Sequence, residues 1–558
     1  MVKKLFSFIN REINGLHEAA YLLGFFALLS QVLALFRDRL LANYFGATSS
    51  LDVYYAAFRV PDLIFASVAS LVSISVLIPF LVERLDKSKE EGKEFISEVF
   101  TIFLFVILVV VALAFVLMPE LMSWFFPTLS VNHPELVLMA RIMLLSPLFL
   151  GFSNFFASIT QVYNRFFIYA ISPLLYNLGI IFGIVVLRPI FGLAGLAYGV
   201  AIGAVMHMAI QLPFVIKQGM FPILKLKIAF SSVRRVVLLS LPRTITASSN
   251  EIAEFFLIAI ASTLAFGSVS VFNLSFNLQS VSLSIIGVSY SLAAFPVLTR
   301  HFTSGRRAEF IAQMIDSARH IIFWSVPLSI LFIVLRAQIV RTILGSGHFN
   351  WSDTRLTAAA LAIFSVSLVC QNLLLLFVRS YYSRGHTKRP LVINAISAIL
   401  MVVLGYGLTQ FFASHQMFAD FVASLLRVSD ISGTVALMLP LAFSIGAIVN
   451  LVIHWLDFSK EYREFSAPVL IVLYQTFASA VLMGGVAYLL LGVFSRIFDL
   501  NTVFGVFLQG FGAGLGGILT YVIILRLLKS RELGEVWRTL HHKIWKTKLV
   551  SLEQPELS

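Results

Sequence analysis

The hydrophobic pattern of this chain is a succession of long apolar runs separated by short polar stretches. Most runs approach or exceed the roughly 20 residues that an α-helix needs to cross a bilayer. Each run therefore predicts a membrane-spanning helix, and the chain is expected to be an all-α polytopic membrane protein with about 14 transmembrane helices. The predicted spans are Ala20–Tyr44, Ala56–Glu83, Phe95–Met118, Leu136–Tyr163, Ile168–Leu187, Leu193–Ile216, Val236–Ser262, Val269–Leu298, His320–Ile339, Thr357–Val378, Leu391–Phe412, Gly433–Leu456, Val469–Val493 and Val503–Leu527.

Composition supports this reading and excludes a soluble multidomain protein. Of the 558 residues, 59% are hydrophobic and only 12% are charged. The net charge of +13 fits cytoplasmic loops that face anionic lipid, so no nucleic-acid partner is expected. The single cysteine, Cys370, lies in an apolar run, cannot form an internal disulfide and offers no metal-ligand spacing.

The distribution of positive charge predicts the orientation. Of the 41 lysines and arginines, about 29 lie in the two tails and the even-numbered gaps between spans, whereas about six lie in the odd-numbered gaps. This bias places both termini in the cytoplasm. The first span is expected to be retained, because no small-residue cleavage site follows the basic start.

A loose internal repeat predicts how the spans are organised. Tyr163-Asn164-Arg165 after the fourth span resembles Tyr382-Ser383-Arg384 after the tenth, and a Pro-x-x-x-Asn spacing follows each. The glycines that follow the first and seventh spans, Gly46 and Gly267, also correspond. Transporters are commonly built from such repeats, with the substrate site between them. The expected segments are an amphipathic lead-in (1–19), an N-terminal six-helix lobe (20–216), a cytoplasmic linker (217–235), a C-terminal six-helix lobe (236–456), two extra helices (457–528) and a basic cytoplasmic tail (529–558).

Charged residues inside the first two spans are the strongest candidates for a site. Arg37, Asp38, Arg39 and Arg59 lie in or beside apolar runs, where charge is costly and rarely kept without a use. A basic-acidic-basic cluster would hold an anion while Asp38 limits the desolvation cost. The alternative is that the cluster lies at the outer headgroups and anchors the helix. The sequence favours a cavity but leaves both interpretations open.

Further charges occur in later spans. Glu251 and Glu254 are spaced to share one helix face, and they would bind a cation or a proton or form a hydrogen-bonded polar stripe. Arg141 lies in the fourth span and Arg243 near the start of the seventh, whereas Arg319 at a span end is expected to reach the interface. The basic C-terminal tail would lie along the inner leaflet or simply solubilise the chain.

Several segments together resemble the MurJ (MviN) family of lipid II flippases. "RDRLLANYFGATSSLDVYYAAFRVPDL" is similar to the family's first loop region, and "RIMLLSPLFLGFSNFFASITQVYNRFFIYAISPLLYN" to its fourth and fifth helices. "VRRVVLLSLPR" and "RSYYSRGHTKRP" resemble the regions at the seventh and tenth helices. The resemblance implies the multidrug/oligosaccharidyl-lipid/polysaccharide exporter fold in the inner membrane of a bacterial cell. It also implies transfer of undecaprenyl-pyrophosphate-linked peptidoglycan precursor to the outer leaflet for cell wall synthesis. It also implies a lipid-tail groove at the two extra helices.

The resemblance assigns residues to a substrate cavity and also shows departures from the family pattern. Arg37, Asp38 and Asp52 match positions of that cavity region, and Arg59 matches a basic position; Arg243 is a further candidate. However, Gln31, Asn277 and Ser280 stand where the family usually carries charge, and Leu257 falls near an acidic residue that some members use for sodium. The cavity is therefore expected to be less cationic than usual, and the exact substrate and the coupling ion stay open.

The resulting hypothesis is a monomeric transporter, not an enzyme, that works by alternating access. Its partners would be a lipid-linked pyrophosphoryl oligosaccharide, membrane lipids and cell-wall synthesis proteins. No cofactor or metal site is expected, and coupling to the membrane potential or a monovalent cation through Glu251 and Glu254 stays open. The alternatives are export of another lipid-linked oligosaccharide and a membrane glycosyltransferase. The second is disfavoured because the acidic residues of the outer loops form no paired motif.

Overall fold

The computed structural model describes residues 16–68, 74–225 and 230–545, and within these ranges it leaves the side chains of 16–21, 74–76, 230–243, 247 and 539–545 undescribed. The helices of the first half are α2 (Leu16–Phe45), α3 (Ser49–Ser67), α4 (Ile74–Leu85), α5 (Lys89–Phe125), α6 (Pro127–Asn132), α7 (Glu135–Met143), α8 (Leu145–Val162), α9 (Phe166–Phe182), α10 (Arg188–Phe191), α11 (Ala194–Ala209) and α12 (Leu212–Lys217). A π-helical turn, η2 (Gly183–Leu187), joins α9 to α10.

The second half continues the helical pattern. Its helices are α13 (Phe230–Ala261), α14 (Ser268–Ser282), α15 (Ser289–Thr303), α16 (Arg307–Val334), α17 (Arg336–Ile343), α18 (Trp351–Val366), α19 (Leu368–Ser383), α20 (Lys388–Ser414), α21 (Gln416–Leu426), α22 (Met438–Glu461), α23 (Ser466–Phe494), α24 (Val503–Leu527) and α25 (Arg531–Trp545). A π-helical segment, η3 (Leu283–Val288), links α14 to α15, and short 3₁₀ turns precede α22 and α23.

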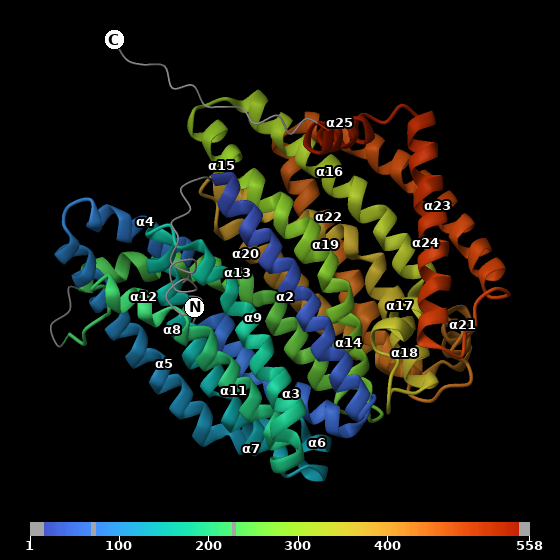
Figure 1. Ribbon diagram of the computed structural model, residues 1–558, viewed down its shortest axis with the longest axis horizontal. Helices are drawn as coiled ribbons and strands as arrows, with labels where there is room; N and C mark the ends of the chain where they lie inside the picture. Colours follow the sequence, from blue (N-terminus) through green and yellow to red (C-terminus); the bar gives the residue numbers. More distant parts are fainter. Residues whose placement is uncertain (1–15, 69–73, 226–229, 546–558) are drawn as a thin grey trace.

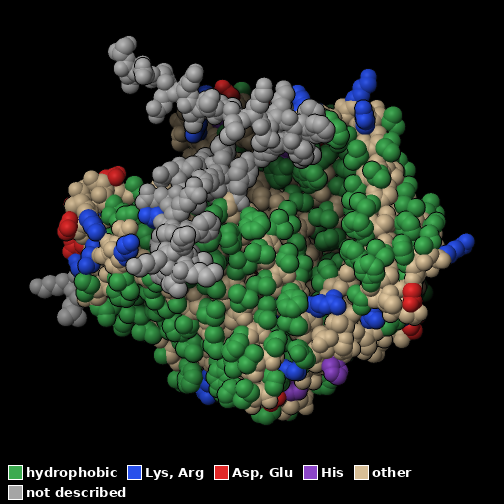
Figure 2. Space-filling model, in the orientation of Figure 1, with side chains coloured by type: hydrophobic (Ala, Val, Ile, Leu, Met, Phe, Trp, Pro, Cys, Tyr) green, Lys and Arg blue, Asp and Glu red, His purple; other side chains and the backbone are tan. Residues whose placement is uncertain are grey.

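The helices confirm a polytopic membrane protein. Within the described chain, ten helical segments are long and apolar enough to cross a membrane, or eleven if α18 and α19, bent by 44° at their junction, form one span. The other three predicted spans coincide with α2, with α3 and α4 together, and with α13. Figure 2 shows the consequence at the surface, where hydrophobic side chains cover the body and lysines and arginines gather toward its ends.

Several predicted boundaries differ from the observed ones. The second span begins at Ser49 rather than Ala56, so that Asp52 lies in a helix. The fourth and tenth spans are each two helices. The fourth breaks at Leu144, three residues before Pro147, which has no N–H to continue the helical hydrogen bonds. At the tenth, the Ser367 hydroxyl donates to the Phe364 carbonyl and so competes with the helical backbone.

Two groups of helices lie side by side (Figure 1). The blue to teal helices α3 to α12 form one group, the green to red helices from α13 onward form the other, and α2 runs diagonally between them. Helix α2 packs on α9, whereas α3 packs on both α13 and α14, so the first three helices and the start of the second half meet at the centre. The exact domain boundaries given by the repeat stay a prediction.

Small residues allow close helix packing in the first group. A Cβ atom at Gly199 on α11 would lie 2.5 Å from the Gly183 Cα, and one at Gly179 would lie 2.3 Å from the Gly203 Cα. Glycines spaced four residues apart on both helices therefore let the backbones touch, as in membrane helix pairs of the small-xxx-small type.

Candidate functional site

A polar cavity of about 240 Å³ lies where α2, α3, α13 and α14 meet. Three of these helices carried the charges that the sequence singled out. The cavity wall mixes basic, acidic, amide and aromatic side chains, which is unusual at membrane depth. Its lining residues are Arg37, Tyr54, Tyr55, Phe58, Arg59, Asp62, Glu251, Glu254, Asn273, Phe276 and Asn277.

Arg37 enters the cavity from α2 and is held by two side chains, one on α2 and one on α9. Its Nε and Nη2 donate to Asp38 Oδ1 at 3.0 and 2.8 Å, and its Nη1 donates to Asn177 Oδ1 on α9 at 3.2 Å. The buried Asp38 carboxylate also accepts from Asn277 Nδ2 on α14 at 3.0 Å. Of the cluster predicted from the sequence, Arg37 therefore lines the cavity, and Asp38 links α2 to α14.

Arg59 forms the second basic centre and bridges the two groups of helices. Its Nη1 donates to Glu254 Oε1 on α13 at 2.8 Å, and its Nη2 donates to Asn273 Oδ1 on α14 at 2.7 Å. Arg59 is only 8% exposed, so most of this ion pair is buried where the helices meet. Arg59 and Glu254, both singled out by the sequence, are therefore direct partners.

Arg39 and Asp52 lie apart from this cavity. Arg39 Nη1 donates to the carbonyls of Thr342 and Ile343 at the end of α17, at 2.6 and 3.1 Å. Asp52 accepts from the N–H of Gly267 at 2.6 Å and from the N–H and hydroxyl of Ser270 at 2.7 and 2.6 Å. Asp52 thus caps the N-terminus of α14, and neither residue lines the cavity among the described side chains.

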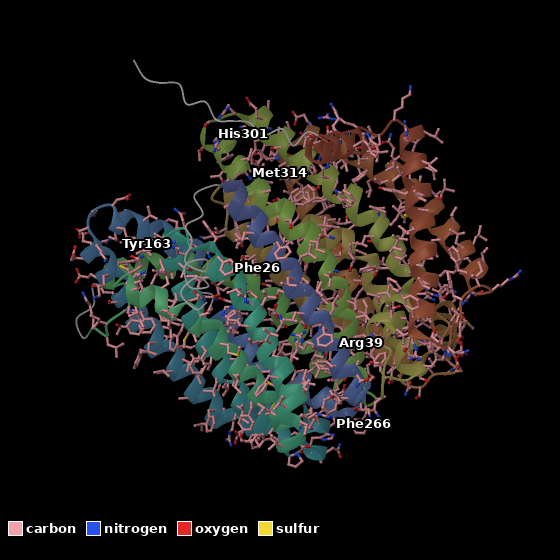
Figure 3. All side chains as sticks on the ribbon, viewed as in Figure 1. Phe26, Arg39, Tyr163, Phe266, His301 and Met314 are labelled. Carbon is pink, nitrogen blue, oxygen red and sulfur yellow. The ribbon has the colours of Figure 1, made fainter. Side chains whose placement is uncertain are left out.

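These contacts join the two groups of helices at one end of the molecule. Figure 3 labels Arg39 and Phe266 at this end, with Tyr163, His301 and Met314 toward the other. The His348 N–H also donates to the Asn43 carbonyl, at 3.0 Å. The joined end is the one that the charge bias predicts to face outward.

The remaining arginine candidates have different outcomes. Arg141 donates through Nε to the Phe115 carbonyl at 3.0 Å and stacks over the Phe115 ring, so it supports α5. Arg319 pairs with Glu532 on α25 at 2.5 Å; instead of only reaching the interface, it holds the C-terminal helix. The side chain of Arg243 lies outside the described residues.

Sequence reasoning missed four polar residues of the cavity wall: Tyr54, Tyr55, Asp62 and Asn273. Asp62 follows Arg59 by about one helical turn, and this spacing places both residues on one face of the helix. The spacing alone could have identified Asp62 as a candidate. The sequence did not single out Asn273, Tyr54 or Tyr55, because amide and hydroxyl groups are common in helices. Only the packing of α3 on α13 and α14 shows that they face the same space.

The described side chains make the cavity acidic rather than cationic. Arg37 and Arg59 are opposed by Asp38, Asp62, Glu251 and Glu254, which is two positive against four negative groups. Two of the carboxylates are paired with the arginines. The expectation that the cavity is less cationic than usual for the family stays a prediction.

A second, apolar cavity of about 650 Å³ lies between α16, α24 and α25. Its lining includes Phe323 and Trp324 of α16, Tyr521 of α24 and Trp537 of α25. Tyr521 closes its wall by donating a hydrogen bond to the Phe323 carbonyl at 3.0 Å. Both extra helices contribute to this cavity, α23 through Met483 and α24 through Tyr521, where the lipid-tail groove is predicted.

Residues 41–509 match the family model described as "Lipid II flippase MurJ". The chain belongs to the MurJ family of lipid II flippases. Among its relatives, "Probable lipid II flippase MurJ" of Thermotoga maritima is 29% identical over 531 residues, covering 94% of this chain and 98% of the relative. "Lipid II flippase MurJ" of Burkholderia cenocepacia is 26% identical over 406 residues, covering 70% of this chain and 77% of the relative.

Solved structures show the same fold. The chain superposes on "Lipid II flippase MurJ, inward closed conformation" with a TM-score of 0.70 at 22% identity, covering 93% of this chain and 99% of the other. It also matches an inward-facing multidrug resistance MATE family transporter of the MOP superfamily, with a TM-score of 0.62 at 17% identity and coverages of 78% and 96%. The MurJ family is a flippase family, so the chain is placed among membrane transporters.

Proposed function

We propose that this MurJ family member moves an undecaprenyl-pyrophosphate-linked peptidoglycan precursor from the inner to the outer leaflet of the bacterial inner membrane. The observation that carries the proposal is the pair of arginines, Arg37 and Arg59, that faces one cavity between the two groups of helices. A planar guanidinium binds phosphate oxygens in a bidentate manner, so the two arginines suit a pyrophosphate.

The arginines are arranged so that an anion can exchange with their protein partners. Arg37 is held by Asp38 and Asn177, and Arg59 by Glu254 and Asn273. The carboxylates neutralise each arginine when the substrate is absent, which lowers the cost of charge at membrane depth. Substrate phosphates would compete with these partners for the same N–H groups.

The proposed cycle is alternating access between the two lobes. The contacts of Asp52, Arg39 and Asn43 hold the lobes together at the end predicted to face outward. Outward opening would break these contacts and expose the bound headgroup on the other side. An inside-negative potential would favour outward movement of the anion, because each unit charge across 100 mV is worth about 2.3 kcal/mol.

The apolar groove beside α24 would receive the lipid tail. Its lining is almost wholly hydrocarbon and aromatic, and residues of α25 form part of it. An isoprenoid chain there would stay within an apolar surrounding while the headgroup occupies the central cavity.

Complementation tests the proposal. A bacterium depleted of its own lipid II flippase would express this chain, its Arg37→Ala and Arg59→Ala variants, and a matched control, Arg389→Ala, at a half-exposed arginine outside the cavity. We expect the unaltered chain and the control to restore growth, whereas both cavity variants fail at equal membrane abundance. Failure of the unaltered chain would shift support to export of another lipid-linked oligosaccharide.

A further inference from the structure

Two carboxylates of the central cavity, Asp62 on α3 and Glu251 on α13, face each other across the lobe boundary. The register follows from two contacts between these antiparallel helices. Arg59 pairs with Glu254 at 2.8 Å, and farther along α3 the Ala66 carbonyl accepts from the Ser248 hydroxyl at 2.9 Å. Asp62 lies three residues beyond Arg59 and Glu251 three residues before Glu254, so both occupy the level between the two contacts.

This pair has no counter-charge of its own among the described side chains. The arginines of the cavity are already occupied, Arg37 by Asp38 and Arg59 by Glu254. Asp62 and Glu251 form neither a hydrogen bond nor an ion pair with another described residue, although both line the cavity. Two like charges that line one cavity repel each other, and a bound cation or a proton between them relieves this repulsion.

The Tyr55 hydroxyl gives an independent indication of a ligand. Tyr55 is 6% exposed and lines the same cavity, yet its hydroxyl has no hydrogen-bond partner among the described residues. Buried hydroxyl groups are normally satisfied, so an orphan one in a cavity wall marks a place where a bound group supplies the partner. As a donor, this hydroxyl suits a phosphate oxygen.

An anionic pyrophosphate would meet net repulsion in this cavity if it entered alone. Among the described side chains two arginines face four carboxylates, so these side chains alone do not supply the positive charge that the substrate requires. A divalent cation resolves this imbalance. Mg²⁺ in particular is typically bound by one or two carboxylates, several waters and the phosphates of a substrate.

We propose that Asp62 and Glu251 are the protein ligands of a divalent cation that enters the cavity with the pyrophosphate of the substrate, while Tyr55 donates to a phosphate oxygen. The proposal rests on the proposed function and deepens it. No group of three or more His, Cys, Asp and Glu side chains in the described chain is suited to hold a metal alone. The phosphate oxygens are therefore needed to complete the site, and metal and substrate bind together.

Binding of Mn²⁺ as a magnetic probe tests this directly. The purified full chain in detergent would be titrated with Mn²⁺ in the presence and absence of inorganic pyrophosphate, and protein-bound Mn²⁺ followed by electron paramagnetic resonance at pH 7. We expect the Mn²⁺–pyrophosphate complex to bind at least tenfold more tightly than Mn²⁺ alone. Asp62→Asn and Glu251→Gln should each weaken that binding at least tenfold, and Tyr55→Phe should weaken it less. Glu309→Gln, at an exposed glutamate of α16, is the matched control and should leave it unchanged.

The same series separates this proposal from a shared proton. If pyrophosphate binds equally well with Mn²⁺ and with EDTA, or if the two carboxylate variants bind it more tightly, the pair does not hold a metal and the proposal is wrong. Growth of the flippase-depleted host separates failure of the metal site from failure of the proposed function, because it reports transport independently of metal binding. Growth that depends on Arg37 and Arg59 but not on Asp62 and Glu251 would support transport and overturn the metal site.

Discussion

The carboxylate of Asp52 accepts hydrogen bonds from both the backbone N–H and the hydroxyl of Ser270, at 2.7 and 2.6 Å, and thereby fastens α3 to the start of α14. Its other oxygen accepts from Gly267, whose φ of +90° places the N–H toward it. A Cβ atom at Gly267 would lie 2.3 Å from the Ala47 carbonyl oxygen, so the two chain segments touch here.

Replacement of Asp52 should loosen this end of the molecule. In Asp52→Asn the amide NH₂ group cannot accept, so either Gly267 or Ser270 loses its partner; the expected cost is about 1–3 kcal/mol. We expect faster labelling of a Phe58→Cys probe in the cavity by a membrane-impermeant thiol reagent added from outside, in a Cys370→Ser background. Thr48→Ala, at the adjacent exposed helix start, is the control, and equal labelling of both variants would contradict the role of Asp52.

The Arg59–Glu254 pair should show strong energetic coupling. Arg59→Ala leaves a carboxylate at membrane depth without its partner, and breaking a buried pair in this way costs about 3–5 kcal/mol. Adding Glu254→Ala removes the unpaired charge and should recover part of the loss. Thermal unfolding of the two single variants and the double variant in detergent measures the coupling. Strictly additive losses would show that the two groups do not stabilise each other.

Close packing of α9 and η2 on α11 should make Gly199 intolerant of the smallest side chain. Gly199→Ala places a methyl group 2.5 Å from the Gly183 Cα, and overpacking of this kind costs about 1–3 kcal/mol. Gly407→Ala on α20 is the matched control, because a Cβ there meets nothing within 4 Å. The unfolding temperature should fall only for Gly199→Ala. A similar fall for both variants would indicate that helix propensity, rather than contact, is responsible.

Docking of α25 on α16 should depend on pH through Glu532. Burial raises the pKa of this carboxyl, but the Ser530 hydroxyl, the backbone and Arg319 lower it more, so the pKa lies below its usual range. The ionised form is therefore favoured in the docked state, and its contribution is fully present above the ordinary glutamate pKa of about 4.3 and lost as the pH falls through the lowered value.

Hydrogen exchange of α25 measures this docking. Protection of α25 from exchange should be steady near neutral pH and decline only below the ordinary glutamate pKa. The Glu532→Gln substitution should weaken the docking of α25 already at pH 7, by about 1–3 kcal/mol. Glu464→Gln, in the 3₁₀ turn before α23, serves as the control substitution. Protection of α25 that is unchanged in Glu532→Gln would show that its apolar contacts alone hold the helix.

The contacts of α25 also explain why the sequence did not predict the role of the tail. Its basic, tryptophan-containing composition fits a leaflet-bound or solubilising tail, because such segments usually carry their charge for lipid or water. In the structure, Glu532 and Glu535, the acidic minority, determine the docking through Arg319 and His320. Two specific ion pairs with α16 are therefore more informative about this helix than its overall composition. They can be identified only from the position of α16 in the structure.

The sequence alone determined the class of the protein, its all-helical spans and most of its charged candidates. Long apolar runs leave the chain no other structure in lipid, because every backbone N–H and C=O must be satisfied within a helix. Charge at membrane depth is similarly informative, and it directed attention to four residues that line one cavity, Arg37, Arg59, Glu251 and Glu254.

Only the tertiary structure decided how these charges are used. Arg37 and Arg39 are two residues apart, so they point in different directions, one into the cavity and the other to the end of α17. Asp52 is committed to the N-terminus of α14, and Asp62 lines the same cavity as Glu251 because α3 packs antiparallel on α13. Hydropathy is a local property that can be read along the sequence. The partner of a buried charge, in contrast, lies on a helix far away in the sequence, and only the packing of the helices determines which residue it is.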